Sequence, residues 1–276
     1  MAGGYIGYPA PQSPTSAPGV WPIDEVYTGR VTGAWPNGFD VFGGTVTSYT
    51  NPSGTYRVHT FTSTDTLTID ALPVASVAAG LDYLLVSGGG GGGSTPNANY
   101  PGGGGGSGAT RTGTLPGAIP YSLPIVVGAG GSGTGGSSNV PTLSLPTPGG
   151  AVGGTSPVGK YGIGSSGGGG NSGSPTPFTG GSGLSFPNPA GYRGGGGGGD
   201  TSAGNPGGVS GVGGNGSPSS INGTNTTYAV GGNAGSGPLL TCPAPPTTRG
   251  TGGRGQGTSA RTPGQPGVFI FRYKVV

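Results

Sequence analysis

Runs of consecutive glycines constrain this chain more than any other feature. Gly88–Gly93, Gly102–Gly106, Gly167–Gly170 and Gly194–Gly199 are examples, and 72 of the 276 residues are glycine. Glycine has no side chain to bury and loses more backbone entropy on ordering than any other residue. Such a chain either stays disordered or packs its backbones so closely that only glycine fits. The second outcome predicts a rigid structural or adhesive module.

Composition favours the ordered outcome. Glycine and proline together make up about 37% of the chain, a level typical of low-complexity sequences. Charged residues are only 6%, however, whereas disordered chains are usually rich in charge. Apolar residues concentrate in 41–87, 115–127 and 267–276, on both sides of the glycine runs. A disordered, silk-like or cell-wall glycine-rich protein is the alternative.

The net charge of +3 is unevenly distributed. From Tyr83 onward there is one acid, Asp200, against eight basic residues. This glycine-rich part of the chain is therefore weakly attracted to anionic surfaces such as nucleic acid or bacterial lipopolysaccharide. The alternative is that scattered arginines only keep a neutral surface soluble.

The N-terminal sequence and the single cysteine argue against several classes of protein. Cys242 is alone, so neither an intrachain disulfide nor a cysteine metal cluster is expected. The first residues lack the basic and apolar regions of a secretory signal. No stretch approaches the roughly 20 apolar residues that span a bilayer. We expect synthesis in the cytoplasm without a signal peptide.

Residues 1–40 are expected to form a separate arm. Five prolines between positions 9 and 22 keep its first part extended. Aromatic anchors on an extended arm suit a docking peptide, because Trp and Tyr dominate interface energetics. The docking candidates are Trp21, Ile23, Tyr27 and Trp35. Alternatively, the two tryptophans cover the edge of the neighbouring β-domain.

The segments that flank the glycine region predict a small β-sandwich. Residues 56–62 and 66–69 alternate apolar and polar side chains, as half-buried strands do. The apolar run 81–86 predicts a central strand, buried on both faces, that leads directly into glycine. Residues 41–87, the inserted strand 115–127 and the C-terminal strand 267–276 form the expected base, with essentially no α-helix.

Residues 88–266 form the expected glycine-rich body. A strict Gly-X-Y period is absent, which excludes collagen. We expect polyglycine type II helices, which are threefold, rise about 3.1 Å per residue and lack internal hydrogen bonds. Their N–H and C=O groups must then bond to neighbouring segments. The fold class is thus mostly β and irregular, with a stacked polyglycine body on a β-sandwich base.

Four segments carry a resemblance to a known family: 58–62, 82–87 before six glycines, 125–131 and 267–273. Together they resemble the glycine-rich domain of bacteriophage tail proteins. The architecture is similar to the tip adhesins of T-even-type phages, in which receptor-reading loops cap a sandwich of polyglycine type II helices. The resemblance covers about 56–276, and 17–27 is more loosely similar to the openings of phage virion proteins. The N-terminal arm departs from the tip-adhesin pattern.

This resemblance implies a non-enzymatic virion protein on the tail or capsid surface, most simply a tail-fibre or tail-tip adhesin. Residues 1–40 would bind other virion proteins. A host-surface receptor, either an outer-membrane protein or lipopolysaccharide, would bind at the other end. We expect no cofactor and no nucleic-acid partner. The oligomeric state is either a monomer or a homo-oligomer. A capsid decoration protein of the same architecture is the alternative.

If the chain runs alternately away from the β-sandwich base and back to it, the turns farthest from the base are predictable. They are expected at Ser94–Pro101, Ser137–Pro148, Asn171–Ala190 and Gly237–Arg249. Apolar side chains in proline-pinned loops lose little entropy on binding, which suits receptor contact. The candidates are Asn97, Tyr100, Leu143, Leu145, Phe178, Phe186, Leu239 and Leu240. Alternatively, these inserts only cap the ends of segments.

Catalysis is not expected. His59 is the only histidine and sits within a predicted strand. Glycine-rich motifs such as Gly-x-Ser-x-Gly and Gly-x-Gly-x-x-Gly arise here from composition alone, and no Gly-Lys-Ser/Thr phosphate loop occurs. The seven carboxylates offer no obvious acid–base pair, although Asp65 and Asp70 could meet in space.

Overall fold

The computed structural model describes ten stretches of the chain. They are residues 41–69, 80–94, 102–115, 121–141, 147, 149–150, 195–205, 211–235, 247–256 and 262–275. Ten β-strands form within them, and these residues contain no α-helix. The expected mostly β fold is therefore confirmed.

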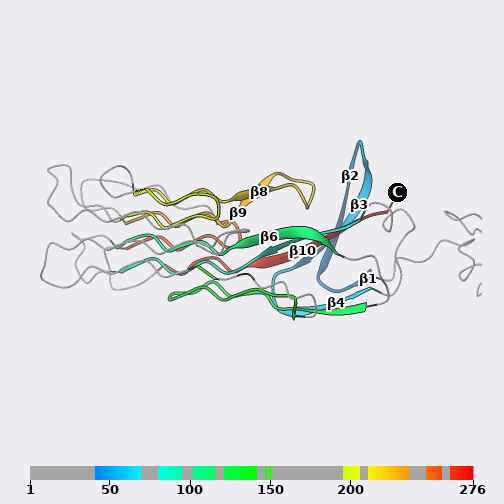
Figure 1. The fold of residues 1–276 in the computed structure, drawn as a ribbon, viewed down its shortest axis with the longest axis horizontal. Helices are drawn as coiled ribbons and strands as arrows, with labels where there is room; N and C mark the ends of the chain where they lie inside the picture. The colour runs from blue at the N-terminus through cyan, green and yellow to red at the C-terminus, as the bar shows by residue number, and fades with distance from the viewer. Residues whose placement is uncertain are drawn as a thin grey trace, which may run out of the picture.

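Two antiparallel sheets form a sandwich, as Figure 1 shows. The five-stranded sheet has the order β2 (Thr45–Asn51), β3 (Gly54–Phe61), β10 (Val268–Lys274), β5 (Leu81–Val86) and β6 (Thr110–Leu115). The three-stranded sheet has the order β1 (Val41–Phe42), β4 (Asp65–Ile69) and β7 (Tyr121–Ile125). Segments from both ends of the glycine region thus meet in one base.

The main core lies between these two sheets. Phe61, Phe269 and Phe271 are essentially fully buried there, and the rings of Phe61 and Phe269 lie 5.8 Å apart. Leu67, Ile69 and Ile125 contribute from the three-stranded sheet. The apolar positions alternate along β4, which is why only one of its faces is buried.

A second, smaller core covers the opposite face of the five-stranded sheet. The short hairpin of β8 (Ser217–Ser219) and β9 (Thr226–Tyr228) places Ile221 and Tyr228 against that face. Leu84 of β5 and Ile270 of β10 pack beneath them. β5 is therefore central and buried on both faces, as the apolar run predicted. Neither β6 nor this hairpin was predicted as a strand.

The glycine segments are direct continuations of the strands. Residues 87–94 follow β5, 102–109 precede β6, and 262–267 precede β10. In Figure 1 these segments run side by side away from the sandwich. Segments 229–235 and 250–256 bond to the same group of segments, and we call the ends at residues 94, 102, 235 and 256 the far end of the body.

Candidate functional site

The glycine segments are joined by backbone hydrogen bonds in a period of three. Segment 88–93 donates its first and fourth N–H groups to segment 133–136, and its second and fifth to 262–265. Its third and sixth N–H groups bond to 103–106, and all six N···O distances lie between 2.8 and 3.0 Å. Successive residues thus point to three different neighbours, as they do in a threefold polyglycine type II helix.

Segment 102–108 extends the same lattice in other directions. Every third N–H group, beginning at Gly102, bonds to segment 250–256 at 2.8–3.1 Å. The N–H groups of Gly104 and Ser107 bond to segment 195–198 at 2.9 and 3.0 Å. A segment inside the body therefore has its backbone groups satisfied by the surrounding segments, without a hydrophobic core.

The spacing of this lattice requires glycine. A Cβ atom built on Gly92 would overlap the carbonyl group of Arg254, and one built on Gly105 would overlap the carbonyl group of Gly90. At Gly133 a Cβ atom would meet nothing within 4 Å. The glycine runs therefore occupy positions that face neighbouring backbones, and Gly133 marks a position where a side chain fits.

Two buried side chains join the glycine body to the sandwich. The carboxylate of Asp200 accepts the N–H and hydroxyl groups of Thr110, at the start of β6, and the hydroxyl group of Ser217 in β8. The hydroxyl group of Ser138 donates to the carbonyl of Val86 at 2.9 Å and accepts the N–H of Gly128 at 2.8 Å. In the sequence Asp200 stood out only as a lone acid.

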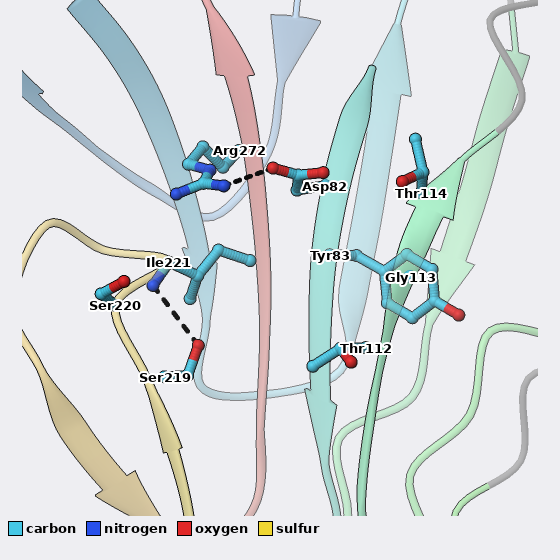
Figure 2. A pocket seen from close by; sticks show the side chains of 9 residues that line it. All are labelled: Asp82, Tyr83, Thr112, Gly113, Thr114, Ser219, Ser220, Ile221 and Arg272. Carbon is cyan, nitrogen blue, oxygen red and sulfur yellow. Dashed lines mark hydrogen bonds and ion pairs between the residues drawn. The ribbon is translucent and has the colours of Figure 1, made fainter. Parts of the chain in front are cut away.

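A polar groove opens on the sandwich beside the β8–β9 hairpin (Figure 2). Its volume is 320 Å³. The lining residues are Asp82, Tyr83, Thr112, Gly113, Thr114, Ser219, Ser220, Ile221 and Arg272. The sequence did not reveal this groove, because one strand of its floor, β6, and its wall, the β8–β9 hairpin, were not predicted.

An ion pair lies at one end of the groove. The guanidinium group of Arg272 pairs with the Asp82 carboxylate, donates to the hydroxyl group of Tyr49 at 2.8 Å and lies 5.0 Å from the ring centre of Tyr56. Burial by itself lowers the pKa of Arg272, but the hydrogen bonds to Asp82 and Tyr49 outweigh it and raise the pKa overall. Arg272 is thus held as a fixed cation.

The predicted site residues lie outside the described residues. This holds for the receptor candidates Asn97, Tyr100, Leu143, Leu145, Phe178, Phe186, Leu239 and Leu240, and for the docking candidates Trp21, Ile23, Tyr27 and Trp35. Some of their neighbours are described. Ser94 and Gly102, which flank the first predicted turn, both contact Gln256 at the far end.

The predicted distal turn at Ser137–Pro148 is wrong. After Val127 the chain turns back already at 132–134, and the N–H of Gly136 bonds to the carbonyl of Ala129. Asn139 then pairs with Val126, and Val140 is buried in the core between the sheets. The prediction assumed that every pass spans the full body, whereas this one is short and returns to the base.

The predicted turn at Gly237–Arg249 is wrong at its second boundary. The carbonyl group of Arg249 accepts the N–H of Ala229, which is buried in the second core. Arg249 therefore lies at the sandwich and not at the far end. The first boundary, Gly237, lies outside the residues that the structure describes.

Comparison with known proteins agrees with the lattice. The family model of the glycine-rich domain matches residues 62–274, which is most of the chain. The chain belongs to the glycine-rich domain family. A comparison with curated protein sequences finds no match. The matched range of this glycine-rich domain begins just after β3 and ends with β10, so it includes five of the eight sandwich strands as well as the body.

His59 of this glycine-rich domain is buried between aromatic rings. Its Nδ1 lies 2.8 Å from the carbonyl oxygen of Gly43, and its ring stacks on Tyr273 with centres 5.8 Å apart. Burial lowers the pKa of His59, and the nearby charge of Arg57 acts in the same direction. These contacts give the imidazole a packing role.

Within the described stretches, no three His, Cys, Asp or Glu side chains gather in a way that could hold a metal ion. The same residues include no helix of the length and apolarity that crossing a membrane requires.

Proposed function

We propose that this glycine-rich domain is a non-enzymatic structural protein of a bacteriophage virion and acts as a tail-fibre or tail-tip adhesin. In this proposal residues 1–40 dock the chain to other virion proteins. The β-sandwich serves as a base, and the polyglycine body holds receptor-binding loops away from the particle. The receptor is an outer-membrane protein or lipopolysaccharide of the host.

The observation that carries the proposal is the threefold hydrogen-bond lattice. Segments that continue different strands cross-link one another through their backbones, so the body is stiff without a core. At the far end the carbonyl of Gly102 accepts the N–H of Gly235, and the N–H of Gly102 bonds to Gln256. The lattice therefore gathers chain segments that are distant in sequence, and the loops between them gain a common rigid support.

The resemblance to phage tail proteins supports the virion context. Within the proposal, Asn97 and Tyr100 follow Ser94, and Leu239 and Leu240 follow Gly235, so both pairs come next to the far end in the chain. Phe178 and Phe186 stay candidates on sequence grounds. Leu143 and Leu145 are no longer proposed, because Val140 and Thr147 on either side lie beside the base.

Cryo-electron microscopy of virions that carry this chain tests the proposal directly. Density at the tail tip or along the fibres, in a handful to tens of copies, is the expected result. Density on the capsid lattice in hundreds of copies would instead support a capsid decoration protein of the same architecture. Absence of the chain from purified particles would refute both.

Receptor contact needs its own experiment. Virions that carry Asn97→Ala together with Tyr100→Ala should adsorb to host cells more slowly than unmodified virions, with an unchanged copy number of the protein. Ser53→Ala, in the β2–β3 turn of the sandwich, is a control that should leave adsorption unchanged. Equal adsorption by all three would refute the role of this loop.

A further inference from the structure

The groove on the sandwich is separate from the far end of the body. It lies over β10, β5 and β6, with the tip of the β8–β9 hairpin as one wall (Figure 2). Its volume of 320 Å³ is at the small end of the range for ligand pockets. A ligand of one or two rings would fill it.

Hydroxyl groups without protein partners converge on this groove. Within the described part of the chain, the side chains of Thr112, Thr114 and Ser220 make no hydrogen bond, and all three residues are exposed. Ser219 accepts only the N–H of Ile221, at 3.3 Å. Each hydroxyl group can both donate and accept. The groove therefore offers several hydroxyl groups, each of which can donate and accept a hydrogen bond.

The charged pair at its edge adds a fixed acceptor. One carboxylate oxygen of Asp82 bonds to Arg272, and the other accepts no hydrogen bond from the described residues. Because Arg272 compensates the charge of Asp82, the groove has little net charge. This disfavours a free phosphate group or a metal ion, since each needs an excess of opposite charge.

We infer that this groove binds a neutral saccharide of one or two sugar units. Sugar hydroxyl groups both donate and accept, so they match the threonine and serine hydroxyl groups, and two adjacent sugar hydroxyls can donate to the free oxygen of Asp82. Ile221, which is largely buried in the second core, lines the groove and adds apolar side-chain atoms for the C–H face of the ring. This site lies on the base and does not depend on receptor contact at the far end.

The test uses the purified 276-residue chain on an array of bacterial oligosaccharides, followed by saturation-transfer NMR with the best-bound neutral oligosaccharide. Thr112→Val with Thr114→Val removes two hydroxyl groups while keeping β-branched side chains. Loss of two hydrogen bonds should weaken binding about 10-fold or more. The matched control, Thr45→Val with Thr47→Val, changes two exposed threonines on β2, outside the groove, and should bind as the unmodified protein does.

Ser220→Ala, at the exposed hairpin tip, provides a second variant that does not alter a sheet strand. It should weaken binding about 3-fold or more. Failure of the unmodified chain to bind any neutral oligosaccharide would overturn the inference. Equal binding by the Thr112/Thr114 and Thr45/Thr47 variants would also overturn it. Location of the chain on the capsid would refute the adhesin proposal and leave this inference standing.

Discussion

Asp200 and Thr110 are 90 residues apart in the sequence, yet the Asp200 carboxylate accepts both the backbone N–H of Thr110, at 3.1 Å, and its hydroxyl group, at 2.6 Å. Ser217 donates a third hydrogen bond to the same carboxylate. The side chain is buried, and the N–H of Asp200 bonds to Ala229 at 3.1 Å. One carboxylate therefore fixes a turn of the glycine body to the starts of β6 and β8.

Replacing Asp200 should destabilise the whole fold. Asp200→Ala leaves the two buried donors of Thr110 and the partly buried hydroxyl group of Ser217 without their acceptor, which should lower the free energy of unfolding by about 3 kcal/mol. Asp200→Asn keeps one acceptor oxygen and should fall between this variant and the unmodified protein. Denaturant unfolding measures both. Asp65→Asn, an exposed carboxylate, is the control and should change stability by less than about 0.5 kcal/mol; an equal effect at both sites would contradict the anchoring role.

A single methyl group added inside the lattice should strongly lower the free energy of unfolding. The Cβ atom of Gly105→Ala would overlap the carbonyl groups of Gly90 and Gly91, which belong to a segment held on several sides. Because the backbones cannot separate locally without breaking hydrogen bonds, we expect a loss of about 3 kcal/mol or more. Thermal unfolding followed by circular dichroism measures this loss.

Gly133→Ala is the matched control for Gly105→Ala. A Cβ atom at Gly133 would meet nothing within 4 Å, and its φ angle is not in the left-handed region. The substitution should be neutral or stabilise the fold by up to about 1 kcal/mol, because alanine restricts the unfolded chain. A large loss at Gly133, or none at Gly105, would refute close backbone packing as the reason for the glycine runs.

The sequence was sufficient to predict the strands with strong apolar patterns. The run in β5 and the C-terminal strand β10 bury both faces, so their composition alone marked them as central. The alternation in β4 likewise follows from burial of one face, whereas β3 buries Val58 on one face and His59 and Phe61 on the other. The glycine runs predicted the lattice because backbone groups without an internal partner must bond to neighbours.

The remaining elements depend on tertiary contacts. β6 carries Thr112, Gly113 and Thr114, a polar pattern with no apolar period, and it is a strand because it pairs with β5. β8 and β9 are only three residues each and are held by the packing of Ile221 and Tyr228. The groove could not be predicted, because its residues come together only through these elements.

Ser138 should be important for the return of the chain to the base. Ser138→Ala leaves the N–H of Gly128 and the carbonyl of Val86 without this buried partner, which should cost about 2 kcal/mol. The amide proton of Gly128 should also exchange faster with solvent. Hydrogen exchange measured by NMR tests this, with the exposed Ser53→Ala as the control. Unchanged exchange at Gly128 would show that Ser138 does not hold this junction.

The free energy of unfolding should decrease as the pH is lowered below about 6.5, because of His59. Burial holds the pKa of His59 below its ordinary value of 6.5, the charge of Arg57 adds to this, and the hydrogen bond to Gly43 opposes it. As the pH falls through 6.5, the unfolded chain binds a proton that the folded chain does not yet bind. The free energy of unfolding should therefore be constant above this pH and decrease below it, by up to about 1.4 kcal/mol per pH unit.

His59 is the only histidine, so no other side chain has an ordinary pKa between about 5 and 7. Denaturant unfolding across this window should show the slope in the unmodified protein. His59→Gln, which is neutral at every pH, should remove the slope even if it lowers stability overall. A slope that persists in His59→Gln would assign the pH dependence to the carboxylates, whereas a flat profile in the unmodified protein would mean that His59 is protonated equally in the folded and unfolded states.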